Sequence, residues 1–170
     1  MPPIARRLSS AALIIGLTAG VGGCQQGSTF GPSPTASEHD GVGTVTSIID
    51  GDTLRLEVDG DDVRVRLIGI DTPEVYPDIE CFGPEASAAI AELAPEGSQL
   101  TFTYDVDRRD RFDRELMYLF TLDGVFINAA LVEQGFATAV LFEPNDRHWN
   151  ELRALERQAR DAGLGLWSAC

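Results

Sequence analysis

The stretch Val65–Glu74, VRLIGIDTPE, decides the fold. Leu67, Ile68 and Ile70 are apolar, which is typical of a strand whose end is buried. Arg66 stands near one end, and the segment DTPE places two carboxylates at the other. A cation and two anions at the two ends of one short strand indicate that the strand positions charged groups as well as packing in a core.

Alternating residues extend outward from this stretch on its N-terminal side. In 63–70, VRVRLIGI, apolar residues alternate with Arg64 and Arg66, and in 53–58, TLRLEV, leucines alternate with polar residues. This alternation predicts half-buried strands. The segment DGDD from Asp59 is a hairpin turn signal. With a further strand over 44–49, the sequence predicts a three-stranded meander.

The rest of the chain alternates helical and strand patterns. Residues 84–94 predict a helix that begins at Pro84, and two strands follow over 99–106 and 116–122. A short helix is expected with Asn128 as its N-cap and Gly135 as its stop, and a last helix over 146–162. Five strands with a helix between the third and the fourth form the order of an OB-fold barrel. The expected class is therefore α+β, a five-stranded OB-fold β-barrel with three α-helices, in a domain over 41–170.

The first residues predict export. Arg6 and Arg7 precede an apolar run over 11–23 that is shorter than a membrane span and has the length of a signal-peptide core. The run ends in VGGC, which resembles a bacterial lipobox with Cys24 as the acylated residue. We expect a signal peptide over 1–23, a lipid anchor on Cys24 and a flexible Gly-, Pro- and Ser-rich tether over 24–40. An ordinary cleaved signal beside a chance cysteine is the alternative.

Cysteine usage agrees with export. If Cys24 carries lipid, Cys81 and Cys170 remain, and an even pair in an oxidising compartment predicts a disulfide. The protein is therefore expected outside the cytoplasm, anchored to the cell membrane through lipid.

The charge balance restricts how the protein can hold a nucleic acid. The chain has 13 basic residues, all arginine, and 27 acidic residues, for a net charge of −14; loss of Arg6 and Arg7 gives −14 − 2 = −16. This composition excludes a broad cationic surface that grips phosphates. An anionic substrate has to be held locally, by a few arginines or a metal ion.

Two carboxylates are expected to meet at one rim of the barrel. Asp52 begins the second strand and Asp71 follows the third, and antiparallel neighbours bring these ends together. Adjacent carboxylates repel each other, and a hard cation such as Ca²⁺, which prefers oxygen ligands, removes the repulsion. Glu74, close to Asp71, can serve as a general base. Taken alone, each of these residues also fits an ordinary turn or surface position.

The combined pattern is more specific. The segments IDGDT, VRLIGIDTPE, CFGPEAS, DRFDRELMY, NAALVEQGFA and GLW occur in unbroken order over 42–167 and resemble the staphylococcal-nuclease-like (thermonuclease) family. The resemblance implies a Ca²⁺-dependent endonuclease that hydrolyses phosphodiester bonds of DNA and RNA. It assigns Asp52, Asp71 and the carbonyl of Thr72 to the metal. It assigns Arg66 and Arg114 to the phosphate and Glu74 to the base.

The chain departs from the family at four positions. Asp113 stands where the family usually has Gly before the second arginine, and it is expected to weaken phosphate attraction or to pair with Arg114. Phe112, Val140 and Phe142 stand at places that match nucleotide-contacting tyrosines. Phosphate hydrogen bonding and base stacking are both expected to be weaker.

Three functional readings remain open. The first is an exported, membrane-tethered monomeric nuclease, and the retention of all six site positions favours it. The second is a non-catalytic OB-fold module that binds nucleic acid or a protein partner. The third is an enzyme that acts on another phosphodiester, which the acidic surface and the missing tyrosines keep open.

Overall fold

The computed structural model describes residues 39–170, so the predicted signal peptide (1–23), Cys24 and the tether as far as residue 38 lie outside the described residues. The strands are β1 (Gly41–Ile48), β2 (Thr53–Val58), β3 (Asp61–Leu67), β4 (Ile70–Asp71), β5 (Gln99–Thr103), β6 (Glu115–Thr121) and β7 (Thr138–Ala139). The helices are α1 (Gly83–Leu93), α2 (Ile127–Glu133), α3 (Trp149–Asp161) and the single turn α4 (Leu166–Ala169).

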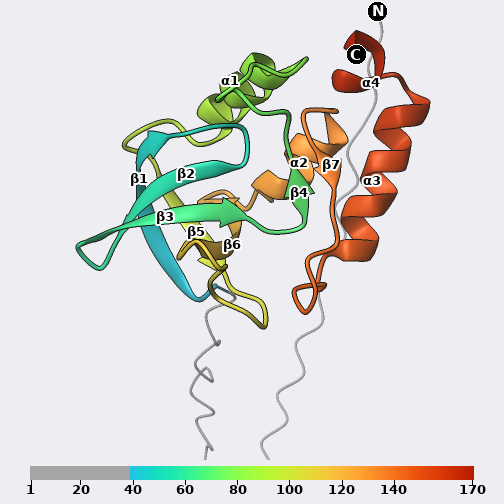
Figure 1. The fold of residues 1–170 in the computed structure, drawn as a ribbon. Helices are drawn as coiled ribbons and strands as arrows, with labels where there is room; N and C mark the ends of the chain where they lie inside the picture. The colour runs from blue at the N-terminus through green and yellow to red at the C-terminus, as the bar shows by residue number, and fades with distance from the viewer. Residues whose placement is uncertain (1–38) are drawn as a thin grey trace, which may run out of the picture. The chain divides into compact units, whose positions relative to one another are not determined.

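Five of the strands close into a barrel in the order β1-β2-β3-β6-β5 (Figure 1). The β1, β2 and β3 meander is antiparallel, as the alternation predicted, while β3 and β6 run parallel. A closed five-stranded barrel with three helices confirms the predicted fold class. The short α4 and the two-stranded β4–β7 sheet are additions that the sequence did not predict.

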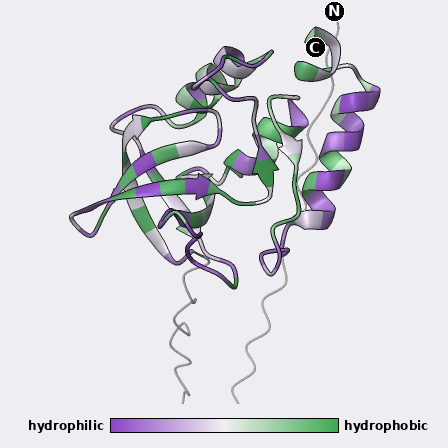
Figure 2. Cartoon of the chain, in the orientation of Figure 1, coloured by the Kyte–Doolittle hydropathy of each residue, from purple (hydrophilic) through white to green (hydrophobic). Residues whose placement is uncertain are grey.

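The alternating strands and the helices share one core. In β2 and β3 the inward residues Leu54, Leu56, Val65 and Leu67 have no exposed surface, and Figure 2 shows hydrophobic and hydrophilic residues alternating along these strands. Each long helix adds buried side chains to this core: Ile90 from α1, Leu131 from α2 and Leu152 from α3. Burying one such side chain stabilises the fold by about 1.5–3 kcal/mol.

The chain bends sharply after β3. The predicted strand over 63–70 ends at Leu67, and Gly69 then adopts a positive φ of 79°. A Cβ on Gly69 would lie 2.6 Å from the Leu152 side chain, so α3 packs against the bend itself. After the bend, β4 pairs with β7, which places Asp71 in a separate small sheet and not at the end of β3.

Asn128 fastens this bend and is not the N-cap of α2. The capping position is Phe126, without a side-chain cap, whereas Asn128 is fully buried. Its amide donates to the Ile68 carbonyl at 2.9 Å and its oxygen accepts the Leu119 N–H at 3.1 Å. The prediction of a cap was wrong because a buried tertiary pairing takes up the side chain.

The ends of other strands and helices differ by a few residues from those that the sequence predicted. The first strand begins at Gly41, the strand predicted over 99–106 ends at Thr103, and the last helix begins at Trp149. Within residues 39–170, none of the helices combines the length and the apolar character that crossing a membrane requires.

Candidate active site

The turn IDGDT brings Asp52 against the loop that follows β4. The N–H groups of Ile49 and Asp50 both donate to the Thr53 carbonyl, which closes the turn. Gly51 in its middle lies so near Thr72 that an added Cβ would be 2.7 Å from the threonine hydroxyl oxygen. Glycine at this position therefore allows the two segments to meet.

The Asp52 carboxylate is held by hydrogen bonds on both oxygens. Its Oδ2 accepts the backbone N–H of Thr72 at 2.9 Å and the hydroxyl of Thr72 at 3.2 Å. Its Oδ1 accepts the Thr53 hydroxyl at 3.1 Å. Asp52 and Thr72 are each 5% exposed, so this carboxylate is fixed in an interior position.

Arg66 joins the two predicted metal-binding carboxylates. One terminal nitrogen, Nη1, donates at 2.9 Å to the carbonyls of Leu67 and Ile70 and lies 3.0 Å from Asp52 Oδ2. The other, Nη2, donates to Asp71 Oδ1 at 2.8 Å. Arg66 is 6% exposed, while the Asp71 side chain is 57% exposed, so the cluster opens to solvent on the Asp71 side.

Burial makes the negative charge of this cluster unfavourable. The pKa of Asp52 is raised to about 7, chiefly by desolvation; Asp50 and Asp71 also raise it, and Arg66 offsets only part of the effect. Desolvation also raises the pKa of Asp71, against the lowering effect of Arg66. Ionisation of these two carboxyl groups is therefore disfavoured in the folded protein, and Arg66 offsets only part of that cost.

A hard divalent cation fits this donor set. Asp52, Asp71 and the Thr72 carbonyl would supply oxygen ligands alone, and an added positive charge would favour ionisation of the two carboxyl groups, which Arg66 stabilises only in part. In residues 39–170 no group of three or more His, Cys, Asp or Glu side chains is arranged as a metal cage. Two carboxylates and a carbonyl suit a cation that keeps part of its water shell.

Glu74 lies beside the cluster without being bonded into it. The side chain is exposed, and its carboxylate has no hydrogen bond or ion pair to the residues that the structure describes. Partial burial is the main cause that raises its pKa, and the negative charges of Asp50 and Asp71 add to the effect. A raised pKa makes Glu74 a better proton acceptor than an ordinary surface glutamate.

Arg114 lies outside the cluster. It directly precedes β6, whose Leu116 pairs with Arg66 of β3, so the fold brings the two arginines to neighbouring positions of the barrel. Its Nε donates to Asp110 Oδ2 at 2.7 Å and its backbone N–H to Asp110 Oδ1 at 3.0 Å. The alternative that Asp113 pairs with Arg114 is wrong: Asp113 accepts from Arg109 at 2.8 Å. Asp113 also has a φ of 62°, a conformation that explains why glycine suits this position.

Two of the three residues at the tyrosine positions are accessible aromatics near the arginines. Phe142 is 38% exposed, and its ring centre lies 5.7 Å from the Arg66 guanidinium carbon. Phe112 is 63% exposed, with Arg114 5.6 Å from its ring centre. Val140 is half-buried and its N–H donates to the Gly69 carbonyl. These rings can stack on a base but have no hydroxyl to donate to a phosphate.

Sequence reasoning missed two acidic residues. Asp50 accepts the Asp52 N–H at 3.0 Å and influences the pKa of Asp52, Asp71 and Glu74. Its i, i+2 spacing in DGD is the signal of an Asx turn. Asp110, the partner of Arg114, has only a weak signal in the sequence, the i, i+4 spacing in DRFDR, which also contains Asp113.

The fold and the site define the class: an OB-fold barrel that gathers carboxylates and an arginine at its rim. The model of the family described as "Staphylococcal nuclease homologue" matches residues 64–169, and the chain belongs to this family.

The chain is also similar to individual proteins that are named as nucleases. The chain is 33% identical over 126 residues to a thermonuclease of Staphylococcus intermedius, covering 72% of this chain and 74% of the relative. It is 35% identical over 130 residues to endonuclease YncB of Bacillus subtilis (strain 168), covering 74% of this chain and 61% of the relative. A thermonuclease of Staphylococcus hyicus is 32% identical over 127 residues, which are 73% of this chain and 74% of that protein.

Proposed function

We propose that this protein is a Ca²⁺-dependent endonuclease that hydrolyses phosphodiester bonds of DNA and RNA. One observation carries the proposal: Arg66 joins Asp52 and Asp71 in a buried cluster that opens to solvent, in a chain whose relatives are a thermonuclease and an endonuclease. In a cluster that only stabilised the fold, we would expect each carboxylate to have its own positive partner; here two carboxylates share one arginine.

Each residue of the site has a separate role in this proposal. Asp52, Asp71 and the Thr72 carbonyl would hold the cation, and Ca²⁺ bound there would act as a Lewis acid that offsets negative charge on the phosphate. Arg66 Nη2, on the solvent side of the cluster, exchanges its bond to Asp71 for a phosphate oxygen. Glu74 accepts the proton of the attacking water, which its raised pKa favours. Arg114 gives a second cation when a phosphate displaces Asp110.

The test is cleavage of a 5′-labelled single-stranded DNA and a matched RNA by the purified protein, with Ca²⁺ or with a chelator. We expect cleavage that requires Ca²⁺ and a loss of about 10²–10³ in rate for Arg114→Ala, as for removal of one transition-state donor. Arg111→Ala, which removes a neighbouring exposed arginine, is the matched control. Cleavage that persists in chelator would contradict the metal assignment.

One observation favours a second candidate, a non-catalytic OB-fold module. Both arginines assigned to the phosphate are tied to carboxylates: Arg66 to Asp52 and Asp71, and Arg114 to Asp110. Binding of the oligonucleotide without cleavage at saturating Ca²⁺ would support this alternative.

We also propose that the protein is a monomer exported and anchored to the cell membrane through lipid on Cys24, with the domain over 41–170 outside the cytoplasm. The charged start, the apolar run over 11–23 and the VGGC sequence support this proposal. Mass spectrometry of the membrane fraction should find an acylated Cys24 as the first residue. A soluble mature form that begins at another residue would contradict it.

A further inference from the structure

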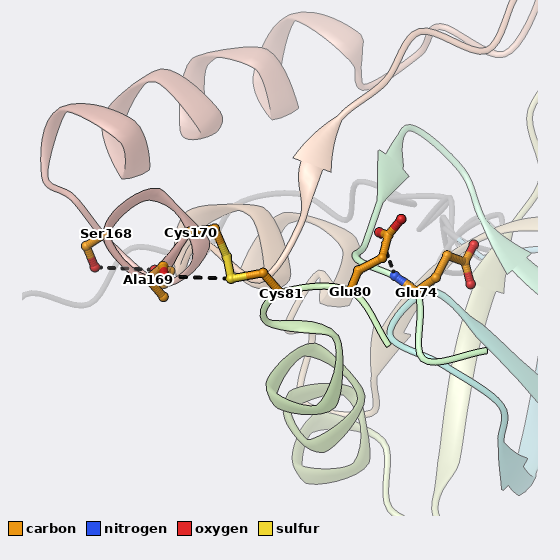
Figure 3. The surroundings of a disulfide bond; sticks show 7 residues. Glu74, Glu80, Cys81, Ser168, Ala169 and Cys170 are labelled. Atoms are coloured by element: carbon orange, nitrogen blue, oxygen red, sulfur yellow. Dashed lines mark hydrogen bonds between the residues drawn. A yellow bond between two sulfur atoms is a disulfide. The ribbon is translucent and has the colours of Figure 1, made fainter. Parts of the chain in front are cut away.

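The loop between Glu74 and α1 is held by two hydrogen bonds between Glu74 and Glu80. The Glu74 N–H donates to Glu80 Oε2 at 3.0 Å (Figure 3). The Glu80 N–H donates to the Glu74 carbonyl at 2.9 Å. Glu80 therefore holds both polar groups of the Glu74 backbone. Because the Glu74 carboxylate has no partner among the described residues, its place is set through this backbone.

Helix α1 packs against the backbone of Glu74. The Gly83 N–H donates to the Glu80 carbonyl at 3.1 Å. A Cβ on Gly83 would lie 2.5 Å from the Glu74 carbonyl oxygen, so the helix start and Glu74 are in direct contact. A shift of residues 80–83 would therefore move Glu74 as well.

The Cys81–Cys170 disulfide fastens this segment to the C-terminus. Cys81 directly follows Glu80 and is bonded to Cys170, 89 residues further along the chain, with 6.0 Å between the Cα atoms (Figure 3). It is the pair that the sequence predicted. The C-terminal side is itself fixed, because the Leu166 N–H donates to the Gly135 carbonyl at 2.9 Å and Gly165 is packed directly against Gly135.

These contacts form a continuous connection from the end of α2, through α4 and the disulfide, to Glu80 and Glu74. We propose that Glu80 and the Cys81–Cys170 disulfide are positioning elements that hold Glu74 at the proposed active site. The inference rests on the proposed function, because it assigns Glu74 a part in catalysis. A disulfide that served stability alone would lower the unfolding free energy on removal and leave turnover of the folded protein unchanged.

The experiment compares oxidised wild-type protein with a Cys81→Ser/Cys170→Ser variant and with Glu80→Ala and Glu80→Gln. We measure kcat and KM on a single-stranded DNA oligonucleotide at saturating Ca²⁺, well below the unfolding temperature of each protein. Leu155→Ala, in α3 and packed against the hydrophobic core, is the control for loss of stability. Hydrogen exchange at the Glu74 and Glu80 amides is measured in parallel.

A displaced general base lowers turnover more than binding, so we expect kcat to fall by about 10-fold in the double serine variant and in Glu80→Ala, with KM within about twofold. Glu80→Gln keeps an acceptor oxygen and should retain more of kcat than Glu80→Ala. The two amides should exchange faster in the double serine variant. Leu155→Ala should lose stability with little change in kcat.

An unchanged kcat in the double serine variant, or an equal fall in Leu155→Ala, would overturn the inference. If the wild-type protein cleaves no nucleic acid, the proposed function fails. In that case the exchange rates still decide whether the disulfide holds the Glu74 backbone, and unchanged exchange would reject that too.

Discussion

At the scale of single residues, Asp52, which we propose as a cation ligand, is expected to lower the stability of the domain when no cation is bound. Its carboxylate is buried and its pKa is raised to about 7, chiefly by desolvation. Ionising Asp52 at neutral pH therefore costs more in the folded state than in the unfolded state, where water hydrates the carboxylate. The burial that would favour a bound cation is therefore expected to make the cation-free domain less stable.

We expect Asp52→Asn to raise the free energy of unfolding in chelator at neutral pH by roughly 1–3 kcal/mol, since a pKa shift of one unit corresponds to about 1.4 kcal/mol. The asparagine side-chain oxygen can still accept the Thr72 N–H, and Arg66 still has its ion pair with Asp71. Urea unfolding with and without Ca²⁺ measures the effect. The variant should also lose the stabilisation that Ca²⁺ gives the wild type; a less stable variant in chelator would contradict this account.

Asp113 is also expected to lower the stability of the domain, through its backbone conformation. Its φ of 62° is unfavourable for a residue with a Cβ, and its ion pair with Arg109 is on the surface and contributes little. We expect Asp113→Gly to stabilise the protein by about 0.5–1 kcal/mol. Asp113→Ala, which removes the charge and keeps the Cβ, is the control, and thermal unfolding compares the two. Equal stabilities of the two variants would show that backbone strain is not the cause.

At the scale of elements, the bend between β3 and β4 places Arg66 and Asp71 against each other. Asn128 holds this bend from α2 and β6 through two buried hydrogen bonds. Removing one partner of a buried hydrogen bond leaves the other unsatisfied, which costs about 1–3 kcal/mol.

We therefore expect Asn128→Ala to lower the unfolding free energy by about 2–4 kcal/mol for its two lost bonds and to reduce kcat as the bend loosens. Asn150→Ala, at an exposed position of α3, is the matched control. Denaturant unfolding gives the first quantity and oligonucleotide cleavage the second. A variant as stable and active as Asn150→Ala would show that Asn128 does not maintain the bend.

These elements also show what the sequence could and could not predict. The alternation in β2 and β3 predicted the barrel, because period-2 burial is a local pattern. The division of 63–70 into β3 and β4 was missed, because it depends on Gly69 meeting Leu152 of α3. Asn128 was predicted as a cap, because its buried partners lie on other elements. The pairing of Arg114 with Asp110 depends on loop geometry, which residue types alone do not determine.

At the scale of the whole molecule, the net charge of −14 opposes binding of a polyanion. Several arginines are already neutralised: Arg55 by Asp62, Arg109 by Asp113 and Glu115, and Arg114 by Asp110. Few cations are left to release counterions when nucleic acid binds.

We predict a weak KM for nucleic acid with a shallow or reversed dependence on salt at low ionic strength, where repulsion is least screened. Short single-stranded substrates should be preferred to long duplex DNA, because they bring fewer phosphates near the acidic surface. KM for both substrates at several salt concentrations, with saturating Ca²⁺, measures this. Tight duplex binding that weakens steeply with salt would show that the cleft is locally basic.

The central claim, that Glu74 and the Asp52–Arg66–Asp71 cluster together hydrolyse a phosphodiester, is tested most directly by single-turnover cleavage of a labelled DNA oligonucleotide with Ca²⁺ by wild type and Glu74→Gln. We predict cleavage by the wild type and a loss of about 10²–10⁴ in rate for Glu74→Gln, the range for a general base. We also predict the same Ca²⁺-induced rise in unfolding temperature for both proteins. A Glu74→Gln rate near that of the wild type, with both proteins folded and Ca²⁺ bound, would contradict the claim.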